Sequence, residues 1–360
     1  MVVLYLQENM TKKTEDEILL IKLCKGLAEI CNRINRGEPA YLVNDSQPSP
    51  QPLYEAFEKL SIKWILRDGV MRHPSILNMV EAARKSVEAV EPDFCNFVDY
   101  PDEPLIEDFT RISDEAEEYA REYSLSLELD SNQSYIPRLM ATIRELSLPE
   151  KTYTVFRRFI AENPFPCDFD LASLQDNHPE IERVKEYLDE AYCEDPPQSQ
   201  DKPLCKVCGG YLDCAAREIE GCCKPLARRV SKAPKIDTVI CLIRPSLIEL
   251  RLEKQLKEMG LEVELWPELD KVDLKITFSD GEVWAVDAKD WAIASRLARK
   301  LNQDTIPNIG QLESFFVVPD YRWNKPKYQA ILESKYQGKI LVIPESELLK
   351  KVRNKSQKIK

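Results

Sequence analysis

The feature that most constrains the fold lies in the last third of the chain, where a predicted helix is succeeded by three short hydrophobic runs. The helical pattern covers residues 245–259 and ends at Gly260. A Ser-Asp-Gly hairpin signal separates the second run from the third. The runs occupy residues 261–266, 272–278 and 282–288. This order of one helix and three strands is the beginning of an α/β domain.

The pattern continues to the end of the chain. Helices are expected at 291–302 and 325–335, and strands at 314–319 and 339–344. The whole series predicts an α/β domain over residues 236–360, with helices around a central mixed sheet. We interpret its first residues, 236–243, as a strand or lead-in. The lysine-rich end, 350–360, is interpreted as a frayed basic tail that adds non-specific affinity for phosphates.

The first 195 residues are predicted to be mainly α-helical. Residues 14–35 place apolar side chains at alternating steps of three and four, as an amphipathic helix does. Further helical patterns occupy residues 53–66, 73–90, 113–123, 134–146, 152–161 and 179–192. The polar, proline-bearing segment 193–203 is the clearest linker in the chain. We therefore expect an α+β multidomain protein: a helical acidic region at 1–195, a small cysteine cluster at 204–224 and the α/β domain at 236–360.

Acidic residues at two of the predicted strands suggest a metal site. Phosphodiester hydrolysis needs a divalent metal held by carboxylates and a group that positions or activates water. Asp273 lies at the start of the second run, and the third run ends in Asp287-Ala288-Lys289. Alternate side chains of a strand point to the same face, so Asp287 and Lys289 are expected to emerge together. A hairpin would bring Asp273 alongside Asp287.

An acid-x-lysine triplet is weak evidence by itself. The chain also contains Asp273-Leu-Lys275 and Glu333-Ser-Lys335. An exposed ion pair at a strand end is the simpler interpretation of Asp287 and Lys289, and such a pair contributes little. The surrounding acid, hairpin and helices favour a functional site. Asp270 remains an alternative to Asp273 as the first acid, although Asp273 lies within the alternating strand.

The segment resembles the restriction-endonuclease-like, PD-(D/E)xK, superfamily, whose core order is αβββαβ with metal-binding acids on the second and third strands. The resemblance implies a magnesium- or manganese-dependent endonuclease. It implies that Asp273 bridges the metal and the phosphate, and that Asp287 and the Ala288 carbonyl complete the metal site. Lys289 would then orient the attacking water. In members similar to the Mrr group the first helix carries a glutamate, a place that Glu249 could fill as an accessory ligand.

A narrower resemblance rests on three parts of the chain. The segment 266–292, the cysteine cluster and the sequence YTVFRRFIAENP at 153–164 are similar to the restriction-endonuclease-like partner of pPIWI-RE modules. These prokaryotic modules pair an Argonaute/PIWI-like protein with a helicase and such a nuclease. The resemblance implies DNA, or an RNA–DNA hybrid, as the substrate, and a role in defence against mobile elements or phages.

Five of the 11 cysteines lie between Cys205 and Cys223. Clustering without a secretion signal favours metal binding over disulfides. Cys205 and Cys208, followed by two glycines, have the form of a zinc knuckle. Cys222 is the expected third ligand of a structural zinc ion. Cys214 is favoured as the fourth because adjacent Cys222 and Cys223 would chelate one metal only with strain, but Cys223 remains an alternative.

The charge of the chain is distributed unevenly. Residues 1–223 hold 24 Lys and Arg against 43 Asp and Glu, whereas residues 224–360 hold 26 against 19. The candidate nuclease therefore lies in the basic part of the chain. A basic surface is what binding along a nucleic-acid phosphate backbone requires. A non-catalytic zinc-bearing adaptor on a degenerate nuclease fold is the alternative function, but the Asp/Asp/Lys set favours the enzyme.

Other functional classes find little support. The chain has two histidines, His73 and His178, each at a predicted helix start where capping or a surface position is expected. No phosphate-binding P-loop or dinucleotide-binding glycine motif occurs. No apolar stretch is long enough for a membrane span, and the N-terminus lacks the features of a signal peptide. A cytoplasmic protein without membrane partners is therefore expected.

Overall fold

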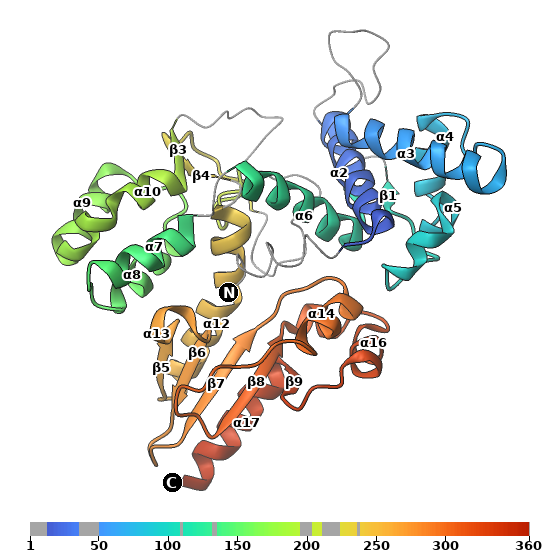
Figure 1. The fold of residues 1–360 in the computed structure, drawn as a ribbon. Helices are drawn as coiled ribbons and strands as arrows, with labels where there is room; N and C mark the ends of the chain where they lie inside the picture. The colour runs from blue at the N-terminus through green and yellow to red at the C-terminus, as the bar shows by residue number, and fades with distance from the viewer. Residues whose placement is uncertain are drawn as a thin grey trace.

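The computed structural model describes most of the chain (Figure 1). The described residues are 13–35, 50–108, 111–131, 135–194, 204–210, 224–235 and 238–359. Helical segments lie above a C-terminal sheet in this view, and α6 (Asp114–Ser131) runs between two groups of helices. No helix among the described residues is long and apolar enough to cross a membrane.

The C-terminal sheet has five strands in the order β5-β6-β7-β8-β9. The first three strands are antiparallel to their neighbours, whereas β7, β8 and β9 run parallel. The predicted mixed sheet is therefore confirmed. The strand bounds are Glu262–Leu265, Leu274–Thr277, Val283–Ala288, Glu313–Val318 and Leu341–Pro344.

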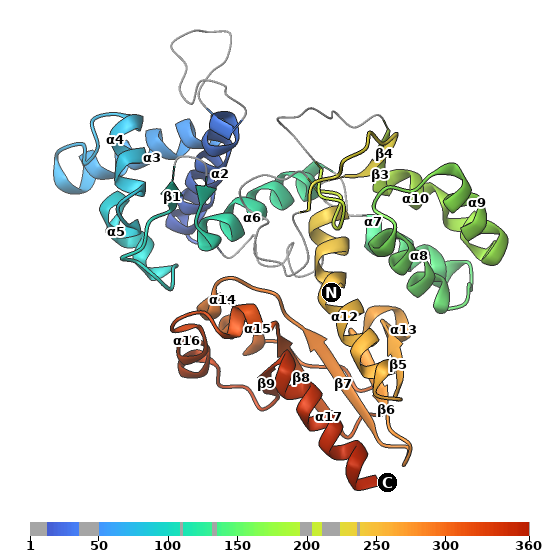
Figure 2. The same ribbon diagram turned by 180° about the vertical axis from the view of Figure 1, so that it is seen from behind.

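Helices cover both faces of this sheet because its central strands are apolar on both sides. On β8, Phe315 and Val317 belong to the hydrophobic cluster that contains α12 (Arg244–Glu258) and α17 (Glu345–Ile359). The alternate residues, Phe316 and Val318, contact α14 (Ala294–Leu301) and α16 (Tyr328–Lys335) on the other face. Accordingly, α17 lies behind the sheet in Figure 1 and in front of it in Figure 2.

Two flanking predictions for this domain are corrected: the strand alternative for the residues before α12, and the frayed tail. Residues 239–243, interpreted as a strand or lead-in, form a π-helical turn that continues directly into α12. The apolar run there is buried by the helices around it, and periodicity alone does not separate a short buried helix from a strand. The basic tail is not frayed: it belongs to α17, which buries Leu348 and Val352 against the sheet.

The first group of helices forms a hydrophobic core of its own. Its elements are α2 (Glu15–Asn35), α3 (Gln51–Asp68), α4 (Ile76–Ala83), α5 (Val87–Val90), η1 (Pro92–Asn96) and α6, with the short strands β1 (Ile106–Asp108) and β2 (Arg111–Ile112). Leu23, Leu27 and Leu60 are among its fully buried side chains. His73, expected at a surface or cap position, is instead buried, and its ring packs edge-on against Trp64.

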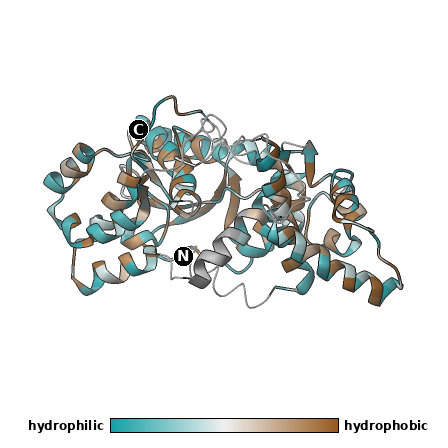
Figure 3. Cartoon of the chain, turned by 90° about the horizontal axis from the view of Figure 1, so that it is seen from above, coloured by the Kyte–Doolittle hydropathy of each residue, from teal (hydrophilic) through white to brown (hydrophobic). Residues whose placement is uncertain are grey.

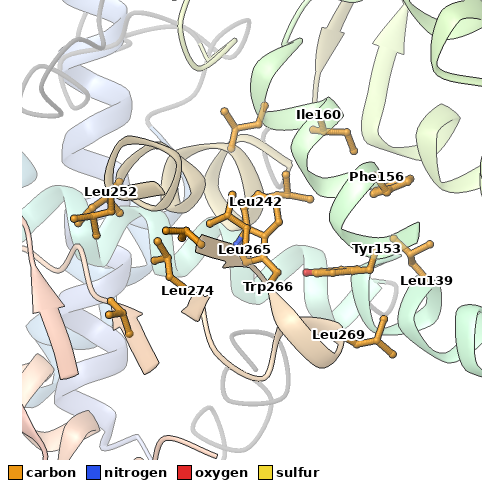
Figure 4. Packing of buried hydrophobic residues seen from close by; sticks show 14 of the residues in the cluster. Leu139, Tyr153, Phe156, Ile160, Leu242, Leu252, Leu265, Trp266, Leu269 and Leu274 are labelled. Carbon is orange, nitrogen blue, oxygen red and sulfur yellow. The ribbon is translucent and has the colours of Figure 1, made fainter. Parts of the chain in front are cut away.

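The second group of helices shares its core with the sheet. Its elements are α7 (Tyr135–Glu145), α8 (Lys151–Glu162), α9 (Asp168–Asn177), η2 (Pro179–Val184) and α10 (Lys185–Ala191). Figure 4 shows Tyr153 of α8 pointing toward Trp266, which follows β5, and Phe156 and Leu269 belong to the same hydrophobic cluster. Figure 3 shows helices that alternate between hydrophilic and hydrophobic residues, as partly buried helices must.

A small two-stranded sheet joins this second group to the start of the C-terminal domain. Strand β3 (Tyr192–Glu194) pairs antiparallel with β4 (Lys232–Pro234). Strand β3 extends into the segment that was predicted to be a linker, and its partner Ala233 lies 40 residues after Cys193. Strand pairing between such distant segments depends on tertiary contacts, so a local pattern of three residues could not predict it.

Candidate active site

Asp273 lies immediately before β6, at an irregularity of the sheet. Leu274 pairs with Val286 in the β6–β7 ladder, and the amide of Asp273 also donates to the Val286 carbonyl, at 3.1 Å. Two residues of one strand thus oppose one residue of the other, an arrangement typical of a β-bulge. The side chain of Asp273 turns toward the end of β7, where its Oδ2 accepts a 2.6 Å hydrogen bond from the amide of Ala288.

The end of β7 provides the other members of the predicted set. Lys289 Nζ donates to Asp287 Oδ1 at 2.5 Å, so the two side chains lie together as the alternation of a strand predicts. The amide of Lys289 donates to the Val317 carbonyl of β8 at 2.7 Å, which fixes the backbone at the carboxyl end of β7. Asp287 is 8% exposed. The simple interpretation of an exposed ion pair is therefore wrong.

Burial and the neighbouring charges shift the pKa values of Asp273 and Lys289. Burial, and then the negative charges of Glu249 and Asp287, raise the pKa of Asp273 well above its usual value. Burial by itself lowers the pKa of Lys289, but Asp287 and Asp273 outweigh it and the pKa lies above its usual value. Lys289 therefore keeps its positive charge near neutral pH. Charged groups that are buried and closely coupled are common at functional sites.

Glu249 lies on α12 and is buried. Its two carboxylate oxygens accept hydrogen bonds from Nη2 of Arg157, at 3.0 and 2.9 Å. Trp266 Nε1 donates to Glu249 Oε2 at 2.6 Å. The structure thus places Glu249 near Asp273, whose pKa it influences, while its own oxygens are bound by an arginine of the helical region.

Asp270, the alternative first acid, has different partners. Arg157 Nη1 donates to Asp270 Oδ1 at 2.7 Å, and the hydroxyl of Tyr153 donates to Asp270 Oδ2 at 3.0 Å. Asp273 instead contacts the end of β7. The geometry therefore groups Asp273 with Asp287 and Lys289, and groups Asp270 with the helical region.

Reasoning from the sequence missed Arg157 and Tyr153 as neighbours of this site. Both lie on α8, and Arg157 precedes Glu249 by 92 residues. The only local signal was their place in the segment YTVFRRFIAENP, which was noted for its resemblance but not for any contact. A buried arginine within an otherwise apolar helix face requires a buried acid, yet the sequence does not say which one.

The donor set suits a divalent cation by its charge. Four carboxyl groups (Glu249, Asp270, Asp273 and Asp287) lie against two cationic side chains, Arg157 and Lys289. When all six groups are ionised, two negative charges remain without a counter-charge, and one divalent cation would neutralise them. Within the described parts of the chain, however, no group of three or more His, Cys, Asp or Glu side chains is arranged around a common metal position. Their oxygens instead contact Arg157, Lys289 and the Ala288 amide.

The predicted zinc ligands are described only in part. Cys205 and Cys208 are buried, and the Cys205 sulfur accepts a 3.4 Å hydrogen bond from the Val207 amide. Gly209, directly after them, has φ of 75° and lies against Pro234, so a larger residue would be strained there. Cys214, Cys222 and Cys223 lie outside the described residues. The zinc site accordingly stays a prediction.

Comparisons with known proteins bear on the C-terminal domain. Residues 246–360 match the family model described as "REase associating with pPIWI_RE". Neither the search of curated proteins nor the search of solved structures found a match. The matched segment contains the predicted residues from Glu249 to Lys289, whereas Arg157 lies outside it. The match over residues 246–360 thus supports the narrower resemblance, to the restriction-endonuclease-like partner of pPIWI-RE.

Proposed function

We propose that the chain is a metal-dependent endonuclease whose active site lies at the carboxyl end of β7. The observation that carries this proposal is the approach of Asp273, across a β-bulge, to the Asp287-Ala288-Lys289 segment. Two acids and a charged lysine converge there although the strands that carry them run in opposite directions. An exposed pair would need neither the burial nor the bulge.

Each residue has a distinct task in this proposal. Asp273, Asp287 and the Ala288 carbonyl hold magnesium or manganese, which favour oxygen ligands, and Glu249 is the accessory acid. The bound ion supplies Lewis-acid activation of the phosphate and of a water molecule. Lys289 orients the attacking water and stabilises negative charge that develops on the phosphate oxygens. Its fixed backbone and its pairing with Asp287 keep the ammonium group in place.

The family match supports the proposal of a protein partner as well as that of nuclease activity. Its printed description names an association with pPIWI_RE, and we propose a PIWI-like protein as a partner of this chain. DNA, or DNA in an RNA–DNA hybrid, is the proposed substrate, with a helicase as a further partner and defence against mobile elements as the biological role. We also propose a structural zinc ion at Cys205, Cys208, Cys214 and Cys222. The zinc content of the purified protein, with and without Cys205→Ser, tests that assignment.

Plasmid nicking in the presence of magnesium tests the nuclease directly. Asp287→Asn and Lys289→Ala should each lower the rate by about 100-fold or more, because each removes a group aimed at the charge that develops in the reaction. Lys275→Ala is the matched control: Lys275 also follows an acid-x-lysine pattern, but it pairs with Glu264 at 3.4 Å on the β5–β6 side of the sheet. Its rate should stay within about twofold of the parent protein.

The same experiment distinguishes the alternative function. Equal nicking by the parent protein and both active-site variants would refute the catalytic assignment. If the parent protein binds DNA but does not nick it with magnesium or manganese, the chain is better explained as a nucleic-acid-binding adaptor on a nuclease fold.

A further inference from the structure

Arg157 of α8 is bound on every side by groups of the C-terminal domain. Its Nη2 contacts both oxygens of Glu249, its Nη1 contacts Asp270, and its Nε donates to Ser246 Oγ at 3.1 Å. The guanidinium lies 4.4 Å from the centre of the Trp266 ring. Arg157 is only 5% exposed. One side chain of the helical region thus joins α8, α12 and the segment that follows β5.

These contacts occupy Glu249 in a way that opposes metal binding. Oε2 accepts from both Arg157 and Trp266, which uses its two lone pairs. Oε1 accepts from Arg157 as well. A divalent cation beside Glu249 would also lie beside the guanidinium, and like charges repel most strongly where water is excluded. Glu249 can therefore serve as a metal ligand only after Arg157 has released it.

Arg157 also holds a strained turn. Trp266, Glu268, Leu269 and Asp270 all have left-handed backbone angles, with φ of 50°, 52°, 59° and 67°. Residues with a Cβ disfavour this region, and such strain persists only where surrounding contacts impose it. Arg157 contacts both ends of the turn, through Trp266 and Asp270, and Tyr153 supports Asp270. A segment held in this way can adopt a second arrangement when its contacts change.

We propose that Arg157 is a positioning residue that occupies Glu249 in the metal-free site, and that binding of a divalent cation is coupled to the release of Glu249 from Arg157. Asp270, already a partner of Arg157, still balances its charge when Glu249 turns to the metal. Through this one side chain, α8 controls the metal affinity of a site that lies entirely in the C-terminal domain. The inference rests on the proposed function, because it requires a metal at Asp273 and Asp287.

Calcium binding by the full-length chain, measured by titration calorimetry, tests the coupling without any catalytic readout. Arg157→Gln should tighten calcium binding by between about fivefold and 150-fold, the usual range for coupled sites. Arg158→Gln is the matched control, because Arg158 follows on the same helix and contacts Glu253, one turn beyond Glu249 on α12. Its calcium affinity should stay within about twofold of the parent. Equal or weaker binding by Arg157→Gln would overturn the proposal.

Two further variants keep the test decisive. If Arg157→Gln does not fold, Arg157→Lys keeps the positive charge but cannot form the forked contact, and its calcium affinity should still rise. Unchanged or weaker binding by the lysine variant would then refute the coupling. Asp287→Asn should abolish calcium binding. If it binds calcium as the parent does, the proposed metal site itself fails; if it loses calcium while Arg157→Gln gains nothing, only the coupling fails.

Discussion

The two groups of helices meet the C-terminal domain in different ways. The second group, α7 to α10, belongs to the same hydrophobic cluster as α12 and β5 to β7. The first group has a separate cluster, to which Ile293 is the contribution of the sheet domain among the described residues. Apolar burial therefore unites the second group with the sheet, whereas the first group depends mainly on polar contacts.

Those polar contacts follow a stripe of acids on α6. Asp114, Glu118 and Glu122 are spaced four residues apart and so share one face of the helix. Glu118 accepts hydrogen bonds from the amides of Ala292 and Ile293, at 2.6 and 3.1 Å. The stripe also pairs with the cationic side chains of Arg296, Arg322 and Lys325. Part of the negative charge of the N-terminal half therefore meets the basic half of the same chain.

Charge and apolar burial therefore stabilise two separate interfaces in this protein. Salt screens charges that are near water but leaves apolar burial intact. Because the pairs of the acidic stripe are largely buried, salt screens them only in part. We expect high salt to weaken the attachment of the first group of helices modestly and to leave α7 to α10 attached to the sheet. Three substitutions test this comparison.

The largest effect is expected where α8 enters the shared core. Phe156→Ala should lower the free energy of unfolding of the C-terminal domain by about 3–5 kcal/mol, because Phe156 is fully buried in its cluster. Phe169→Ala is the matched control: Phe169 is 78% exposed on α9 and should change stability by less than about 0.5 kcal/mol. Urea unfolding measures both. A loss below about 1 kcal/mol for Phe156→Ala would show that α8 is not part of this folding unit.

A smaller effect is expected at the acidic stripe. Glu118→Gln should weaken the docking of α6 by about 1.5–3 kcal/mol, because it removes the charge that faces two backbone amides and Arg296. Hydrogen exchange at α14 should increase in this variant and should increase further at high salt. Glu58→Gln, at an exposed position of α3, should leave that exchange unchanged. Exchange at α14 that is equal in Glu118→Gln and the parent would contradict a charge-based interface.

The smallest effect, counted per pH unit, is a change in pH dependence within α6. Burial, and then the nearby charges of Asp99 and Glu118, raise the pKa of Glu115 to about 8. The folded state therefore keeps a proton that the unfolded chain loses above its ordinary pKa, and stability should fall as pH rises from about 4.5 toward 8. The slope is at most about 1.4 kcal/mol per pH unit. Glu115→Gln should flatten it, as thermal unfolding at pH 6 and pH 8 would reveal; an unchanged slope would assign the pH dependence to other groups.

Much of the C-terminal architecture could be predicted from local patterns in the sequence. The hydrophobic runs and the hairpin signal predicted the succession of helices and strands along the chain, and the alternation of β7 predicted that Asp287 and Lys289 emerge together. These features are local, since strand periodicity and turn chemistry act over a few residues. The family match then supported the resemblance.

The neighbours of the site, in contrast, depend on tertiary packing. Arg157 contacts Glu249 and Asp270, and so connects both acids to the helical region. The residues before α12 and the lysine-rich tail are helical because neighbouring elements bury their apolar side chains. The helices are also divided between two cores. Contacts between residues about a hundred positions apart depend on how whole elements pack, and no local pattern encodes that packing. The acids of the site and Lys289 were visible in the sequence, but Arg157, which binds Glu249 and Asp270, was not.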